Sequence, residues 1–219
     1  MATYPFGRGG FEVSKLEEAT AKRYLPAAEL SKLKSATANN PQCEYARKLF
    51  LFSYYCYGIS FIDMAMLTAA HIKQMEDGDY IVYKRQKIKR QKGVKPISIK
   101  ITPAIRQLIE SLQAASPTVD DFLLPVVTRS GYTGERLYMH IRTRYSKYQK
   151  YLRLLAEELG IDFHLTSYVS RHTAAMTLQR NHIPREVISQ MLGHADLETT
   201  NIYLDSFDNE VINEAAKVL

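Results

Sequence analysis

The change in hydrophobic pattern between residues 79 and 101 constrains the fold more than any other feature. Two runs, "DYIVYKRQ" from Asp79 and "VKPISIKI" from Val94, have the composition and alternation that are typical of β-strands. A polar connector that contains Gly93 joins them, as expected for an antiparallel hairpin. In the rest of the body, apolar residues recur mainly at helical spacing. The sequence therefore predicts a mainly α-helical protein with one small antiparallel β-hairpin or sheet, of the α+β class.

The predicted helices flank this hairpin, and glycine and proline mark several of their ends. Gly58 and Gly160 follow apolar helical stretches, and Pro103 lies at the start of another. Ser60 is a predicted N-cap, with Asp63 in the first turn behind it. The expected helices span about residues 25–36, 42–58, 60–72, 102–115, 135–160, 166–180, 184–192 and 196–204, with a last one from about 208 and a loop over 116–134.

The distribution of residue types along the chain indicates its domain organisation and its cellular compartment. Residues 1–24 contain "PFGRGG" and are expected to form a linker or arm, whereas residues 25–219 form the folded body. No apolar run approaches the roughly 20 residues of a membrane-spanning helix, and the N-terminus lacks the order of a signal peptide. Cys43 and Cys56 have no metal-ligand spacing and are expected to be buried free thiols. We expect a cytoplasmic protein without membrane contact.

Positive charge is concentrated in the hairpin connector. The formal net charge is +6, and seven of the twelve residues from Lys84 to Lys95 are Lys or Arg, with no acidic residue among them. Such a patch favours an anionic partner, and phosphate contacts are its usual role on nucleic acid. The candidate DNA-binding residues are Lys84, Lys89, Arg90, Lys92 and Lys95.

The last sixty residues combine three side chains suited to phosphodiester chemistry. Arg171 lies near the start of one predicted helix, His194 follows Gly193 in a tight turn, and Tyr203 lies nine residues later (203 − 194). A guanidinium offers a fork of donors to a phosphate, an imidazole can donate to another oxygen, and a phenol can attack phosphorus. Each residue alone has an ordinary structural explanation: packing for Tyr203, a backbone bond for His194, a salt bridge for Arg171. The histidines lack close Cys or carboxylate partners, so no metal site is predicted.

The block "LTSYVSRHTAAMTLQRNHIPREVISQMLGHADLETTNIYL" resembles the signature of the tyrosine recombinases, the phage integrase family. Arg171, His194 and Tyr203 match that signature residue by residue. The chain most resembles the integrases of Bacteroidetes mobile elements. The resemblance implies the catalytic-domain fold of tyrosine recombinases for residues 25–219, with residues 1–24 as the linker from a missing N-terminal core-binding domain.

Two positions depart from the pattern that the resemblance implies. Ser60 occupies the position of the family's first arginine, although "YGISFIDMAMLTAAHI" is otherwise similar to that motif. Tyr168 stands where most members have a histidine, and its hydroxyl can still donate a hydrogen bond. In the Bacteroidetes subgroup a serine at the first position accompanies an R-x-K sequence in the hairpin, so Arg85 is expected to supply the missing positive charge.

The catalytic lysine of the family lies in the same hairpin, and its assignment here stays open. Lys87 is the best match, with Lys89 and Lys92 as competitors because the connector is longer than usual.

The resemblance implies site-specific recombination of double-stranded DNA without metal or cofactor. Tyr203 would attack a phosphate to form a 3′-phosphotyrosine, in a synaptic tetramer of protomers that are monomeric without DNA. Two alternatives remain: a DNA-binding module with impaired catalysis, because Ser60 and Tyr168 depart from the common pattern, and a relaxing enzyme similar to type IB topoisomerases.

Overall fold

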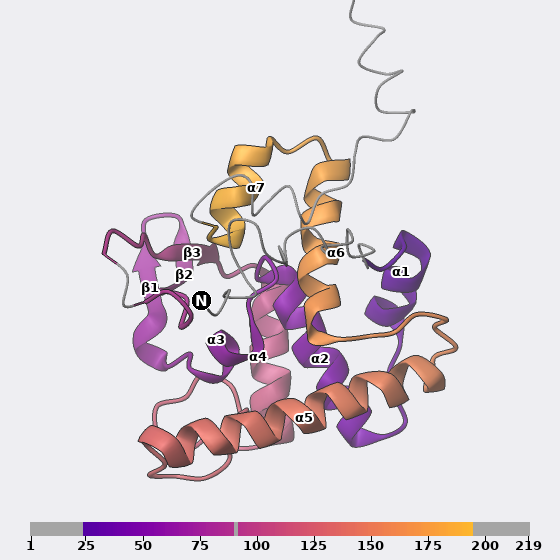
Figure 1. The fold of residues 1–219 in the computed structure, drawn as a ribbon, viewed down its shortest axis with the longest axis horizontal. Coiled ribbons are helices and arrows are strands. Elements are labelled where there is room, and N and C mark those ends of the chain that lie inside the picture. Colours follow the sequence, from indigo (N-terminus) through magenta and orange to yellow (C-terminus); the bar gives the residue numbers. More distant parts are fainter. Residues whose placement is uncertain (1–23, 90–91, 195–219) are drawn as a thin grey trace, which may run out of the picture.

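The computed structural model describes residues 24–89 and 92–194, which form a helical body with a small sheet on one side (Figure 1). The elements follow the chain in the order α1 (Ala27–Ser35), α2 (Pro41–Tyr55), α3 (Phe61–Ala65), a 3₁₀ turn (Ala69–His71), β1 (Ile72–Met75), β2 (Gly78–Tyr83), β3 (Ile97–Lys100), α4 (Pro103–Ala115), α5 (Gly134–Glu158), α6 (Ser167–Arg180) and α7 (Arg185–Leu192). The prediction of a mainly helical α+β protein is confirmed.

Helix α2 is the centre of the core. It contacts α4, α5 and α6, and in Figure 1 the long helix α5 crosses beneath the other three. Four consecutive residues of α2, Leu49–Phe52, are almost completely buried. A helix that is apolar on all sides has to be surrounded by other elements. Helices α4, α5 and α6 therefore enclose this part of α2.

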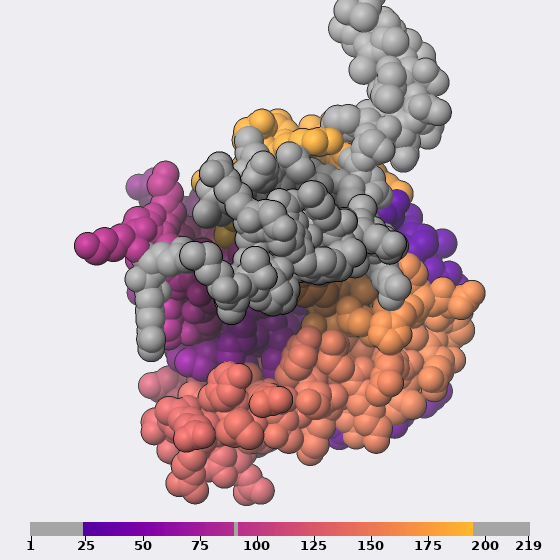
Figure 2. Space-filling model, viewed as in Figure 1, coloured from indigo at the N-terminus to yellow at the C-terminus, as the bar shows by residue number. Residues whose placement is uncertain are grey.

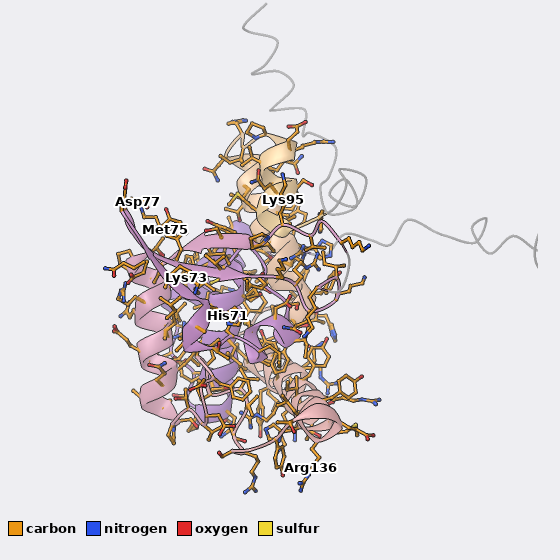
Figure 3. The ribbon with its side chains drawn as sticks, turned by 90° about the vertical axis from the view of Figure 1, so that its left-hand side faces the viewer. His71, Lys73, Met75, Asp77, Lys95 and Arg136 are labelled. Atoms are coloured by element: carbon orange, nitrogen blue, oxygen red, sulfur yellow. The ribbon has the colours of Figure 1, made fainter. Side chains whose placement is uncertain are left out.

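The sheet is antiparallel, with strand order β1-β2-β3. Ile81 of β2 pairs with Ile72 on one side and Ile99 on the other, and Ile81 and Ile99 are fully buried. β3 packs against α7, whereas β1 is the outer strand. Figure 3 shows side chains of β1 and of the turn after it, including Lys73 and Asp77, along this outer edge. Charged residues on an edge strand oppose pairing with another chain.

One element differs from the prediction. The helix expected over residues 60–72 ends at Ala65, and the chain continues through the 3₁₀ turn into β1. The Thr68 amide donates to Nδ1 of His71, which closes that turn. β1 has only four residues, three of them exposed, so its hydrophobic pattern is too short to show a strand. Its structure is set by pairing with β2.

Several local predictions are confirmed. Ser60 caps α3, and Pro103 is the first residue of α4, whose cap Thr102 accepts a hydrogen bond from the Ile105 amide. The chain between α4 and α5 contains no helix or strand, as expected for a loop, and both cysteines are free and buried. Within the described parts of the chain, no helix has the combined length and apolar character of a membrane span.

Candidate active site

Arg171 is the buried centre of the candidate site. It lies in the second turn of α6 and is only 5% exposed. Its Nη1 donates to the carbonyl of Gly58 at 3.0 Å, and its Nη2 donates to the carbonyl of Leu192 and lies 2.8 Å from Nε2 of His194. A guanidinium has only donors, so Nε2 of His194 is the acceptor in this contact. One side chain thus joins α6 to the ends of α2 and α7.

Gly58 allows the close approach between the end of α2 and helix α6. Its φ is +70°, and a Cβ at this position would lie 2.5 Å from the Cα of Arg171. Residues other than glycine rarely adopt this backbone conformation. The collision also involves a backbone atom of Arg171, which cannot rotate away as a side chain could. The position therefore requires glycine, and it brings the Gly58 carbonyl to the guanidinium.

His194 is directed toward Arg171 by the turn at the end of α7. Gly193 has the left-handed conformation, with φ +65°, and the His194 amide bonds to the Ser189 carbonyl at 3.0 Å. A Cβ at Gly193 would collide with Ile97 of β3 and would lie 3.2 Å from Cδ of Arg85. The turn therefore positions His194, and the missing side chain of Gly193 leaves space for Ile97 and Arg85 of the hairpin.

Arg85 reaches the site from the end of β2. Its Nη1 donates to the Gly193 carbonyl at 3.1 Å. The next residue is fixed as well, because the Gln86 amide donates to Oδ1 of Asp63 at 2.7 Å. Asp63 is 3% exposed, and its other oxygen accepts from the Ser60 hydroxyl at 2.6 Å. The carboxylate of α3 therefore anchors the chain segment that carries Arg85.

A cavity of about 400 Å³ between α3, α5 and α6 gathers four of the predicted site residues. Its lining includes Ser60, Arg85, Tyr168 and Arg171. Tyr168 is 55% exposed, and its ring lies 5.5 Å from that of His172. Figure 2 shows the surface of α5 across the lower part of the molecule. The structure thus brings residues from three separate segments to one opening.

The wall contributed by α5 was not predicted from the sequence. It includes Tyr138, Ile141, Arg142 and Tyr145. Residues 138, 141 and 145 recur at intervals of three and four, so they share one helical face. Two tyrosines on a common face were a signal in the sequence. Helical spacing alone did not tell which element this face would meet.

The lysines of the connector lie apart from the arginine cavity. Lys87 is exposed in the turn that follows β2, and it is not among the described residues that line the cavity. Lys84 and Lys89 line a second cavity of about 570 Å³ beside β2. Lys92 and Lys95 are exposed on the connector before β3, where Figure 3 labels Lys95. Arg90 and Tyr203 lie outside the described residues.

Tyr83 is a buried phenol near the site. Its burial, and next the charge of Asp63, raise the pKa of Tyr83 well above the usual value, although the positive charge of Arg171 acts in the opposite direction. Tyr83 is only 6% exposed. It therefore remains protonated at neutral pH and serves as a packing residue between the sheet and the arginines.

Similarity to known proteins agrees with this fold. A profile described as the phage integrase family matches residues 23–210. A tyrosine recombinase of Pseudothermotoga lettingae is 25% identical over 134 residues, which cover 61% of this chain and 42% of the relative. Tyrosine recombinase XerD of Brucella abortus is 31% identical over 121 residues, which cover 52% of this chain and 36% of the relative. The aligned part is less than half the length of either relative.

Solved structures share the same architecture. XerA recombinase superimposes with a TM-score of 0.60 and 22% identity, covering 89% of this chain and 64% of XerA. XerH recombinase, bound to its difH substrate in a pre-cleavage complex, gives a TM-score of 0.61 with 20% identity and covers 89% of this chain and 53% of XerH. This likeness shows the fold, and the profile match extends over most of the sequence. The chain belongs to the phage integrase family.

Proposed function

We propose that this chain cleaves and rejoins DNA at specific sites through a covalent 3′-phosphotyrosine intermediate at Tyr203. The observation that carries the proposal is the junction of Arg171, His194 and Arg85, which hydrogen bonds to each other or to the surrounding backbone hold in place. The relatives described above are tyrosine recombinases, and XerH was solved with its difH substrate. Donors fixed in this way suit the negative charge of a phosphate in its transition state.

Each residue has a defined part in the proposed reaction. The phenolic oxygen of Tyr203 forms a bond to phosphorus, and the bond from phosphorus to the 5′-oxygen breaks. Lys87, with Lys89 and Lys92 as alternatives, gives a proton to that leaving oxygen. Arg171, Arg85 and His194 stabilise the non-bridging oxygens, and each donor contributes about 10²–10³ in rate. A second 5′-hydroxyl reverses the step, so the energy of the phosphodiester bond is conserved and no cofactor is needed.

Arg85 substitutes for the family's first arginine in this proposal. Ser60 stands at that position, and its hydroxyl is engaged by Asp63 as the cap of α3. Arg85 lines the same cavity as Ser60 and carries the charge that a hydroxyl lacks. Tyr168 at the cavity can donate a hydrogen bond in place of the more common histidine.

We further propose the setting in which this site works. The basic connector over residues 84–95 contacts backbone phosphates of double-stranded DNA, and the protomers are monomeric until they assemble as a synaptic tetramer on it. Ser60 together with the R-x-K sequence at Arg85 supports a grouping with the integrases of Bacteroidetes mobile elements. DNA as the substrate implies action in the cytoplasm.

The test captures the covalent intermediate on whichever DNA sequence the chain selects. The chain is incubated with a pool of nicked duplexes of random sequence, and adducts that survive denaturation are isolated, sequenced and mapped by peptide mass spectrometry. Wild type should give an adduct on Tyr203 with an enriched sequence, and Tyr203→Phe should give none. DNA binding without any adduct would favour the impaired binding module. Relaxation of any supercoiled plasmid, without sequence enrichment, would favour the topoisomerase-like alternative.

A further inference from the structure

We infer that the cavity between α3, α5 and α6 holds one unstacked nucleotide of the DNA strand, with its phosphate at Arg85 and Arg171 and its base against Tyr145. The inference rests on the proposed function, because it takes DNA as the substrate. It adds a base-binding wall on α5 to the phosphate-binding residues. The observations that carry it are the rigidity of Tyr145, the chemistry of the lining and the size of the cavity.

Tyr145 is held in place before any ligand binds. Its hydroxyl lies 3.1 Å from the Ser167 hydroxyl and accepts a bond from the Gln149 amide at 3.1 Å. Its ring packs against Phe61, with centroids 5.3 Å apart. The side chain is nevertheless 37% exposed and lines the cavity. A ring that is already fixed loses little conformational entropy when a flat ligand stacks on it.

The lining combines flat apolar surface with positive charge. Tyr138 adds a second ring, which is 59% exposed, and Ile141 lies between the two tyrosines on the same helix. Arg142 joins Arg85 and Arg171, and none of the twelve described lining residues is acidic. These three guanidinium groups make the cavity positively charged, and an apolar peptide or lipid tail carries no charge to complement it. A nucleotide has both an anionic group and an aromatic face.

The cavity has the size of a small-ligand site. Its volume of about 400 Å³ falls within the common range of roughly 300–1,000 Å³. The N-terminus of α6, at Ser167 and Tyr168, borders the same space. The partial positive charge of a helix N-terminus adds to the attraction for phosphate. The arginines and the aromatic residues of α5 line the same cavity, so one nucleotide can contact both groups.

Stacking on the protein offsets the cost of opening the duplex. A base on an aromatic side chain contributes about 1–3 kcal/mol, and unstacking a step costs a few kcal/mol. The free energy gained by stacking on tyrosine is close to the free energy lost by unstacking from the duplex. The base therefore leaves the duplex only where its phosphate also contacts the arginines. The site therefore unstacks the nucleotide next to the reacting phosphate and leaves the rest of the duplex intact.

The test compares thymidine 5′-monophosphate with inorganic phosphate. Both are titrated into chain whose tyrosine rings are isotopically labelled, and NMR shift changes give the dissociation constants. We expect the nucleotide to bind more tightly by about 5- to 150-fold, which is a stacking energy of about 1–3 kcal/mol. Tyr145→Leu should remove this preference without changing phosphate affinity, whereas Tyr145→Phe should retain it. Tyr80→Leu, on the sheet, is the control and should behave as wild type.

The outcomes separate this inference from the proposed function. Equal affinity for nucleotide and phosphate, or equal losses in Tyr145→Leu and Tyr80→Leu, would overturn the inference. Binding needs no covalent step, so Tyr203→Phe should show the same nucleotide preference. A covalent adduct without any nucleotide preference would leave the recombinase proposal intact and reject the base-binding wall. On a captured target, permanganate should modify a thymine placed beside the cleaved phosphate with wild type and not with Tyr145→Leu.

Discussion

Replacing Gly58 with alanine tests the contact between the end of α2 and Arg171. Two costs follow from the structure. A side chain at φ +70° costs about 1–2 kcal/mol relative to glycine. The new Cβ would also lie 2.5 Å from the Arg171 Cα, and such overpacking costs about 1–3 kcal/mol because neither backbone can rotate away. We expect Gly58→Ala to lower the free energy of unfolding by about 2–5 kcal/mol.

Gly131→Ala is the matched control for the backbone cost. Gly131 has φ +72°, and a Cβ there would have no neighbour within 4 Å. Both variants also restrict the unfolded chain equally, so that effect cancels between them. Urea denaturation with a common m-value measures both free energies. The difference between the variants should be about 1–3 kcal/mol, which isolates the collision with Arg171.

Gly58→Ala should also affect the reaction at the candidate active site. The Gly58 carbonyl accepts from Arg171, so a shift of this backbone displaces the guanidinium. Adduct formation should fall in Gly58→Ala under conditions in which the variant is still folded, and it should be unchanged in Gly131→Ala. If Gly58→Ala is no less stable than Gly131→Ala, the close approach of α2 to α6 is not the constraint described above.

Three further predictions concern single side chains. Asp63→Ala should lower the unfolding free energy by about 1–3 kcal/mol, measured in urea, because the Gln86 amide loses its buried acceptor, and Asp63→Asn should cost less since it keeps an oxygen there. Burial opposes ionisation of Glu44, but its bonds from Arg47 prevail and hold the pKa of Glu44 below its ordinary value of 4.5. The stability that this carboxylate contributes is therefore present above pH 4.5 and lost as pH falls through the lowered pKa, so the difference in unfolding free energy between wild type and Glu44→Gln should shrink in acid. Arg171→Lys should reduce the rate of adduct formation about 10²-fold or more, because an ammonium lacks the fork that joins two carbonyls and an imidazole.

Local sequence signals predicted the elements whose structure is decided locally. The hairpin, the cap at Ser60 and the tight turn at Gly193 each depend on a few neighbouring residues. β1 escaped prediction because four mostly exposed residues carry no pattern, and only pairing with β2 makes them a strand. Such pairing is a tertiary effect that hydrophobic periodicity does not record.

In the candidate site, too, local features were predictable from the sequence and features that depend on tertiary contacts were not. Residue type and spacing identified Arg171 and His194 as candidates, and the structure places them in direct contact. The Gly58 carbonyl that holds Arg171 belongs to a residue 113 positions earlier, so no local pattern reveals it. The wall around Tyr145 was missed for a related reason. Its helical face was visible in the sequence, but the cavity exists only where α3 and α6 meet α5.

The most direct test of the central claim asks whether Arg85 and Arg171 act on one phosphate. A captured target is prepared with either a normal phosphate or a methylphosphonate at the cleavage position, which replaces a charged non-bridging oxygen with a neutral methyl group. Adduct formation is then measured for wild type and Arg85→Ala. On phosphate the variant should lose about 10²–10³ in rate, and on methylphosphonate most of this loss should disappear, because the charge that Arg85 stabilises is absent. An equal loss on both substrates would contradict the assignment of Arg85 to the reacting phosphate.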